Sequence, residues 1–219
     1  MVTPEHHVAV VDHLVQHSHP VRRIWSVRIR LTVFLLFGGV SGTLVAWMWA
    51  RPDLVAKLHE PSFTIGLLAL ALATGCAALL ALRSAVPGRG PSHLESALTL
   101  LLVGAAAFSI GIRFLLDTDA TASRLLDAGW PCALRTLAFA VPPWSVLLIA
   151  IRRGAPVHVT SAGAYAGAAA LLLATTALRA ACRDDDPSHW LIWHFAVVIT
   201  GTALSTALAT TWLRRWRHD

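Results

Sequence analysis

The chain has 219 residues, of which 56% are hydrophobic and only 14% are charged, and its mean hydropathy is +0.62. Soluble domains carry about 25% charged residues, so this composition excludes an ordinary soluble domain and favours an integral membrane protein. The formal net charge is +6, and its distribution along the chain carries information about orientation.

Six apolar runs are each long enough to cross a bilayer as a helix, which takes about 20 residues. They cover residues 31–50, 63–82, 96–115, 133–151, 161–181 and 190–212. No small-residue cleavage site follows the first run, so we expect it to remain as a span. The predicted fold class is all-α: an integral membrane bundle of six transmembrane helices. We divide the chain into a short cytoplasmic N-terminal tail (1–29), the transmembrane domain (30–213) and a cytoplasmic C-terminal tail (214–219).

Basic residues are unevenly shared between the alternate connections. With the N-terminus inside, eleven of the 18 Lys and Arg residues fall on the inner side, and seven fall on the outer side or at outer span mouths. The positive-inside rule then places both termini in the cytoplasm of a multi-pass inner-membrane protein. This bias accounts for the basic pI of about 10.5, and we expect no direct nucleic-acid binding because the basic residues are spread over four short segments.

Two spans carry small residues one helical turn apart, which lets helix backbones approach closely. These are Gly38 and Gly42 in the first span and Gly163 and Gly167 in the fifth. In the fourth span, Pro142 and Pro143 remove two backbone donors and predict a kink or weak point. We expect Trp residues near the span ends, Trp190 among them, to anchor the chain at the membrane interfaces.

Ionisable residues are sparse within the runs, which disfavours a transporter or channel. Asp and Glu are absent from all six runs. Arg113, Arg135 and Arg179 each lie within about two turns of an outer end, where a long side chain can snorkel to the surface. A coupled ion pathway normally needs an ionisable group near the midplane.

Two cysteines fall at the same predicted depth. Cys132 comes just before the run 133–151 and Cys182 just after the run 161–181, and a short loop joins these runs into an antiparallel hairpin. Because both runs cross the bilayer, both thiols should stand on the outer face within reach of each other. Cys76 lies deep within its own span, so we exclude it from this pair of outer thiols.

The two thiols differ in their surroundings. Cys132 precedes a predicted helix N-terminus and Arg135 follows one turn later, and both features favour its thiolate. Cys182 is followed by the acidic run 184–186, which disfavours its thiolate. Such a pair suits attacking and resolving roles in thiol oxidation. The sequence favours equally the alternative that the two cysteines form a structural disulfide in an oxidising compartment.

Histidines add a metal-binding possibility. His189 and His194 lie near Cys182 and could join the two thiols as ligands of a thiophilic metal, whose identity the sequence leaves unknown. His13 and His17 have metal-ligand spacing on a helix. No cysteine or carboxylate completes a set beside them, so we interpret this part as a polar arm.

Several segments match a known family in order along the chain. They are HPVRR (19–23), RPDL (51–54), SAVPGR (84–89), CALRTLAFAVPP (132–143), RRGAP (152–156), CRDDD (182–186), WLIWH (190–194) and LRRW (213–216). This set resembles the bacterial multi-pass membrane anti-sigma factors called negative regulator of sigma-F (NrsF). The resemblance implies an inner-membrane protein that holds an extracytoplasmic-function sigma factor inactive until envelope stress is sensed. It also implies that cysteines matching Cys132 and Cys182 take part in sensing.

One departure from the family pattern bears on the signal. Many relatives have His immediately before the second cysteine, where this chain has Ala181. The difference favours thiol oxidation over metal binding as the signal. A thiophilic metal would in either case be a signal and not a cofactor, and we expect no cofactor.

The N-terminal tail is the largest inner segment that could hold the sigma factor. Its residues Val8, Val11, Leu14 and Val15 would share one face of a short amphipathic helix. The pair Arg22 and Arg23 is a further candidate contact. The expected partners are therefore the sigma factor and the lipid bilayer, with the signal passing from Cys132 and Cys182 through the bundle to the tail.

Two other function classes stay open. A membrane thiol–disulfide oxidoreductase would need a second cysteine pair or a C-x-x-C motif, and three cysteines with one in mid-span do not supply it. We therefore expect no enzyme and no catalytic residues. A structural membrane subunit braced by a disulfide is the remaining alternative.

Overall fold

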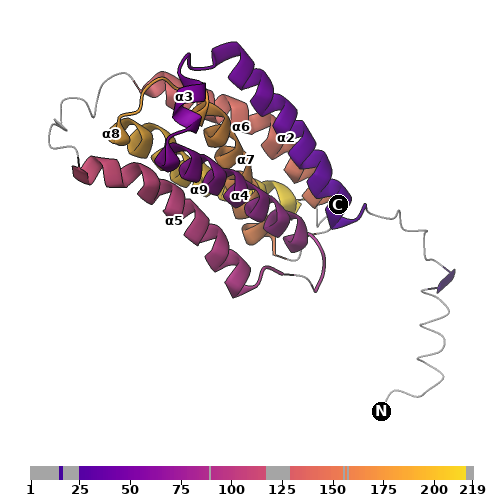
Figure 1. Cartoon of the computed structure of the whole chain (residues 1–219). Helices are drawn as coiled ribbons and strands as arrows, with labels where there is room; N and C mark the ends of the chain where they lie inside the picture. Colours follow the sequence, from indigo (N-terminus) through magenta and orange to yellow (C-terminus); the bar gives the residue numbers. More distant parts are fainter. Residues whose placement is uncertain are drawn as a thin grey trace.

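The computed structural model describes residues 15–16, 25–88, 90–116, 129–154, 156 and 158–215. Within these ranges the chain is all-helical and has no strand, which confirms the all-α part of the predicted fold class. Six long helices form one bundle (Figure 1). They are α2 (Val27–Trp49), α4 (Pro61–Ser84), α5 (His93–Leu116), α6 (Trp130–Arg152), α7 (Val159–Arg179) and α9 (Ala196–Arg215).

Each predicted span matches one long helix, and all six are long and apolar enough to cross a membrane. Three short elements were not predicted. They are α3 (Leu54–Leu58), α8 (Pro187–Trp190) and the π-helical turn η2 (Leu191–Phe195), which leads directly into α9. The ends also shift by a few residues: α7 ends at Arg179, and α6 begins at Trp130, so Cys132 lies in the first turn of α6.

Local chemistry explains where several helices begin. At the start of α2, Ser26 Oγ accepts a hydrogen bond from Ile29 N at 3.3 Å, which satisfies one of the free amides of the first turn. Pro61 is the first residue of α4, where its missing N–H costs nothing. Before α5, Ser92 and Glu95 exchange hydrogen bonds between side chain and backbone in a capping box.

Helices α4 and α7 form the centre of the bundle. Of their apolar windows 56% and 61% are buried, against 18–33% for the other four long helices. α7 packs against α4, α6 and α9, and α5 packs against α4. The large apolar side chains that remain exposed lie mainly on α2, α5 and α6, around this centre. The helices outside the centre thus present apolar surfaces outward.

Three of the four glycines singled out in the sequence lie at close helix contacts, whereas a Cβ on Gly42 would make ordinary contact with Ala177 at 3.6 Å. A Cβ on Gly163 would come within 2.7 Å of a side chain of α9, and one on Gly167 would overlap Ser205 of the same helix. A Cβ on Gly38 would come within 2.6 Å of Leu173. These glycines therefore allow α7 to approach α9 and α2 closely, as predicted.

Helix α6 continues through the two prolines inside it, Pro142 and Pro143. A polar contact follows at the next residue, where Trp144 Nε1 donates to Ser205 Oγ at 2.7 Å. Ser205 Oγ donates in turn to the Gly163 carbonyl at 3.0 Å. This chain of hydrogen bonds joins α6, α9 and α7 beside the prolines.

Contacts between distant residues define the two ends of the bundle. At one end, Arg30 Nη1 donates to the Ala150 carbonyl at 3.1 Å, and the Arg152 guanidinium lies over the Trp212 ring. The start of α2 therefore shares this end with the final residues of α6 and α9. The other end, which we call the cysteine end, contains the end of α2, the starts of α4 and α6, and the end of α7.

Most of the proposed docking residues of the tail lie outside the described residues. These are Val8, Val11, Leu14, Arg22 and Arg23. Val15 is described and is exposed. The docking role of the tail and the limits of the three predicted domains therefore stay predictions.

Candidate functional site

The structure brings Cys132 and Cys182 together at the cysteine end. Their Sγ atoms lie 3.9 Å apart, and both thiols are free. Cys132 stands in the first turn of α6. Cys182 follows the end of α7, where its amide donates to the Leu178 carbonyl at 2.7 Å and closes the last turn. Cys76 lies inside α4 and takes no part in this arrangement.

Both predicted histidines lie beside the two thiols. The ligand atoms of Cys132, Cys182, His189 and His194 all fall within 4.8 Å of one another. His189 Nε2 lies 3.6 Å from Cys182 Sγ. His189 is supplied by α8 and His194 by η2, so three separate segments converge on this point. We call these four residues the cysteine–histidine cluster.

The His194 ring is fully buried and fixed in orientation. It stacks on Trp190 with ring centroids 3.9 Å apart and an interplanar angle of 15°. Thr136 Oγ1 donates to the Cys132 carbonyl at 2.9 Å and lies 3.4 Å from His194 Nδ1. The Thr136 hydrogen is directed to the Cys132 carbonyl, so its oxygen is free to accept from Nδ1–H, and that tautomer leaves the Nε2 lone pair available. His194 Nε2 is buried and has no hydrogen-bond partner among the described residues.

His189 is held by a carboxylate. Its Nδ1 lies 3.3 Å from Asp184 Oδ2, while its Nε2 faces Cys182. A carboxylate behind a histidine is a common arrangement at metal sites, where it fixes the ring and raises its basicity. Asp184 and Thr136 are thus supporting residues that the sequence did not single out for these roles, because nothing in their spacing shows which ring they contact.

The cluster is supported by Trp190, which stacks on His194 and also contacts a buried arginine. The Arg179 guanidinium lies between the rings of Phe63 and Trp190, at 4.6 and 4.5 Å from their centroids. Arg179 is 4% exposed and Trp190 is 0% exposed. The expectations that Arg179 snorkels to the surface and that Trp190 anchors the chain at an interface are therefore wrong. Cation–π contacts hold the arginine inside the bundle instead.

Arg135 does not join the cluster directly. Its side chain is exposed, and its guanidinium lies 6.0 Å from the centroid of the Trp49 ring in α2. Its predicted role as a support for the sensor stays a prediction.

The Cys182 thiol is disfavoured as a thiolate in the absence of a bound ion. The neighbouring Cys132 thiol and burial raise the pKa of Cys182, and the nearby side chains of His189 and His194 only partly offset this increase. The sequence predicted the same direction from the acidic run 184–186. The structure gives a different main reason, which is the neighbouring thiol.

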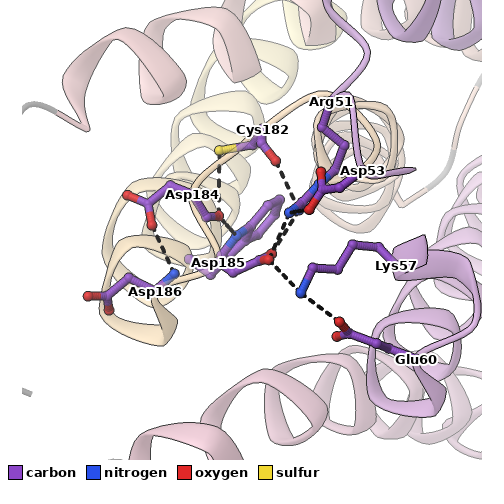
Figure 2. A network of polar contacts seen from close by, with 9 residues as sticks. Arg51, Asp53, Lys57, Glu60, Cys182, Asp184, Asp185 and Asp186 are labelled. Atoms are coloured by element: carbon purple, nitrogen blue, oxygen red, sulfur yellow. Dashed lines mark hydrogen bonds and ion pairs between the residues drawn. The ribbon is translucent and has the colours of Figure 1, made fainter. Parts of the chain in front are cut away.

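A second polar network adjoins the cluster through the Cys182 backbone (Figure 2). Arg51 pairs with Asp53 at 2.7 Å and with Asp185 at 2.8 Å, and Lys57 pairs with Asp185 at 2.9 Å. Burial raises the pKa of Asp185, but hydrogen bonds from Arg51 and Lys57 outweigh it and lower the pKa to about 2. The network is therefore ionised at any physiological pH.

Comparison with known proteins identifies the family. A family model described as negative regulator of sigma F matches residues 14–216, nearly the whole chain. No curated protein and no solved structure matches the chain significantly. The chain belongs to the negative regulator of sigma F family. Membership makes it a negative regulator of a sigma factor, which is a regulatory role.

Proposed function

We propose that this member of the family is an inner-membrane anti-sigma factor that sequesters an extracytoplasmic-function sigma factor. Its six apolar helices support insertion in a bilayer, and the positive-inside bias of the sequence supports cytoplasmic termini. The sigma factor is released when the cysteine–histidine cluster changes state on the outer side.

The single observation behind the sensor is the convergence of four metal-binding side chains. Two thiols and two imidazoles are the donor set of tetrahedral zinc sites. Two Zn–S bonds of about 2.3 Å at a tetrahedral angle separate the sulfurs by about 3.8 Å, and the Cys132 and Cys182 sulfurs lie 3.9 Å apart. The buried, unpartnered Nε2 of His194 supplies a ready nitrogen. A thiophilic divalent ion is therefore the signal that this geometry favours.

This proposal reverses the preference drawn from the sequence. Ala181 lacks the histidine that many relatives have before the second cysteine. In this chain, His189 and His194 provide two nitrogen donors from beyond Cys182. The missing histidine thus does not leave the site short of ligands.

Oxidation of the two thiols is the second candidate signal. A disulfide needs the sulfurs at about 2.05 Å, so the 3.9 Å separation must close by about 2 Å. Two thiols would lose two protons and two electrons to an oxidant. The nearness of the two free thiols supports this route.

Metal binding and release of the sigma factor can be tested together. The purified protein, with Co²⁺ as a spectroscopic probe, should bind one ion with thiolate-to-cobalt charge transfer, and Cys132→Ser or Cys182→Ser should abolish that band. In cells, added Zn²⁺ should induce a reporter of the sigma factor, and either substitution should make the reporter constitutive or unresponsive. If both variants bind cobalt like the wild-type protein, or if both show unchanged induction, the proposal that the cluster is the sensor is wrong.

The same substitutions separate the remaining function classes. For a thiol–disulfide oxidoreductase, they would abolish turnover of a dithiol substrate. For a braced structural subunit, they would reduce the amount of protein in the membrane. For the regulator, both variants should accumulate normally and alter only the reporter.

The docking element is proposed to be the N-terminal tail. Deleting residues 1–19 removes neither a span nor its basic flank, so the bundle should still insert. The truncated protein should fail to hold the sigma factor, and the reporter should be active without stress. Leu14→Asp should have much of the same effect, because it places a charge on the apolar face. A truncated protein that accumulates and still represses would move the docking site to the inner loops.

A further inference from the structure

Arg51 lies at the end of α2 and connects that helix to the sensor cysteine. Its guanidinium donates five hydrogen bonds, two to Asp53, two to Asp185 and one to the carbonyl of Cys182. The Arg51 amide also donates to the Ala180 carbonyl at 3.3 Å. Figure 2 shows the side-chain contacts of Arg51 converging from the α2–α3 connection and from the segment after α7.

Every donor of the Arg51 guanidinium is used in this connection, and the side chain is shielded from water. An arginine has five N–H donors in a fixed planar fork, so each donor of Arg51 has a partner. The Arg51 side chain is 2% exposed, where charge-assisted hydrogen bonds are least weakened by water. A lysine has one ammonium and cannot reach both carboxylates and the carbonyl in the same geometry. We call this connection between α2 and the 180–186 segment the tie, and it depends on the guanidinium itself.

The tie joins the sensor to the most peripheral long helix. Only 18% of the apolar window of α2 is buried, against 61% for α7. A displacement of the 180–186 segment therefore meets less packing resistance in α2 than in the central helices. α2 is also the helix that continues toward the N-terminal tail, and its first turn is attached to α6 through Arg30.

We propose that Arg51 is the positioning residue that links the backbone of Cys182 to α2, so that a change of state in the cysteine–histidine cluster moves α2. This inference rests on the proposed function, since it supplies the route from that sensor to the tail. Ligation or oxidation of Cys182 would shift its carbonyl, and Arg51, held to Asp185 of the same segment, would follow.

The test compares two Arg→Lys substitutions in the full-length protein in lipid nanodiscs. Arg51→Lys alters the tie. Arg183→Lys is the matched control, because Arg183 is next to Cys182 and its side chain is exposed. Co²⁺ binding is measured by absorbance, and hydrogen exchange of peptides from α2 is measured with and without Zn²⁺. The sigma-factor reporter is measured in cells with the same variants.

All three proteins should bind one Co²⁺ ion. Zn²⁺ should change hydrogen exchange at both ends of α2 in the wild-type protein and in Arg183→Lys. In Arg51→Lys this change and the reporter induction should fall about tenfold, which is within the usual range of allosteric coupling. Asp185→Asn weakens the same tie from the other side. It should likewise bind Co²⁺ while the α2 response and the reporter induction fall, and it replaces Arg51→Lys if that variant fails to accumulate.

Two results would overturn the link while leaving the proposed function standing. The first is an Arg51→Lys protein that binds the ion and keeps the wild-type response of α2. The second is loss of ion binding together with the response, which would make Arg51 part of the binding site only. If the wild-type reporter does not respond to Zn²⁺ or to a thiol oxidant, the proposed function fails. In that case, hydrogen exchange of α2 peptides with and without Co²⁺ still tests whether Arg51 transmits the change at Cys182 to α2.

Discussion

His194 combines three properties that bear on metal binding. Its ring is fully buried, its Nδ1 faces Thr136, and its Nε2 has no hydrogen-bond partner among the described residues. An unpaired buried polar atom costs about 1–3 kcal/mol. Such a cost is retained in a folded protein when the atom has a further partner, and two thiols lie within reach.

The first prediction concerns this nitrogen. His194→Phe keeps an aromatic ring against Trp190 but removes the metal-binding atom. We expect the affinity for Co²⁺ to fall by more than about tenfold, since loss of even an outer-shell partner costs about 10- to 100-fold. His59→Phe, at an exposed histidine, is the matched control and should bind like the wild-type protein. Equal affinity in His194→Phe would exclude His194 as a ligand.

A second prediction concerns the pH dependence of Cys182. Its pKa is raised, first by the hydrogen bond with Cys132 and then by burial. In the metal-free protein the alkylation rate of Cys182, followed by peptide mass spectrometry, should therefore reach its midpoint above about pH 8.5, the value for a free thiol. Cys132→Ala should lower that midpoint. A wild-type midpoint below that of a free thiol would contradict the geometry.

The same shift affects stability in a defined direction. Below the unfolded pKa of about 8.5, both the folded and unfolded states hold the Cys182 proton. As the pH rises above that value, the unfolded chain ionises first, so the contribution of Cys182 to the free energy of unfolding should decrease.

Among the elements, α7 is defined by how closely its neighbours approach. Gly167 faces Ser205 of α9 without room for a Cβ, whereas Gly104 of α5 has open space at the same position. We expect Gly167→Ala to destabilise the bundle by about 1–3 kcal/mol, as overpacking does. Gly104→Ala should be neutral or stabilising, because alanine favours helix. Thermal unfolding in detergent measures both, and equal melting temperatures would show that the α7–α9 contact can relax freely.

The long helices were predictable from the sequence because hydrophobic length alone specifies a span. The short elements at the cysteine end were not. Residues 187–195 form a helical turn and a π-helical turn in series, and both fall within or beside an apolar run that appears uniform in hydropathy. Their conformations depend on contacts such as Trp190 Nε1 with the Asp184 carbonyl at 2.8 Å. Local pattern does not encode such contacts.

For the whole molecule, the orientation in the membrane is the fourth prediction. The even number of long helices places the start of α2 and the end of α9 at one end of the bundle, and the basic bias makes that end cytoplasmic. Reporter fusions after Arg89 and after Arg153 should report the cytoplasm, and a fusion near Asp119 should report the periplasm. The opposite result at any of the three positions would reject this topology.

The candidate site was only partly predictable at this scale. The meeting of Cys132 and Cys182 followed from span length and hairpin connectivity, which set depth in the membrane. The burial of Arg179 and the pairing of Arg51 with Asp185 did not follow, because they depend on the rotation of helices about their axes. Depth is encoded in the number of residues, whereas rotation emerges from the packing of the complete bundle.

The π-helical turn η2 lets two histidines that are five residues apart face the same thiols. In a continuous α-helix each residue turns the chain by about 100°, so residues five apart point about 140° away from one another. A π turn takes up one more residue than an α turn, and the ligand atoms of His189 and His194 accordingly both lie within 4.8 Å of the two cysteine sulfurs. A substitution that converted Leu191–Phe195 to α-helix would turn one imidazole away from the thiols, although all four side chains of the cluster would still be present.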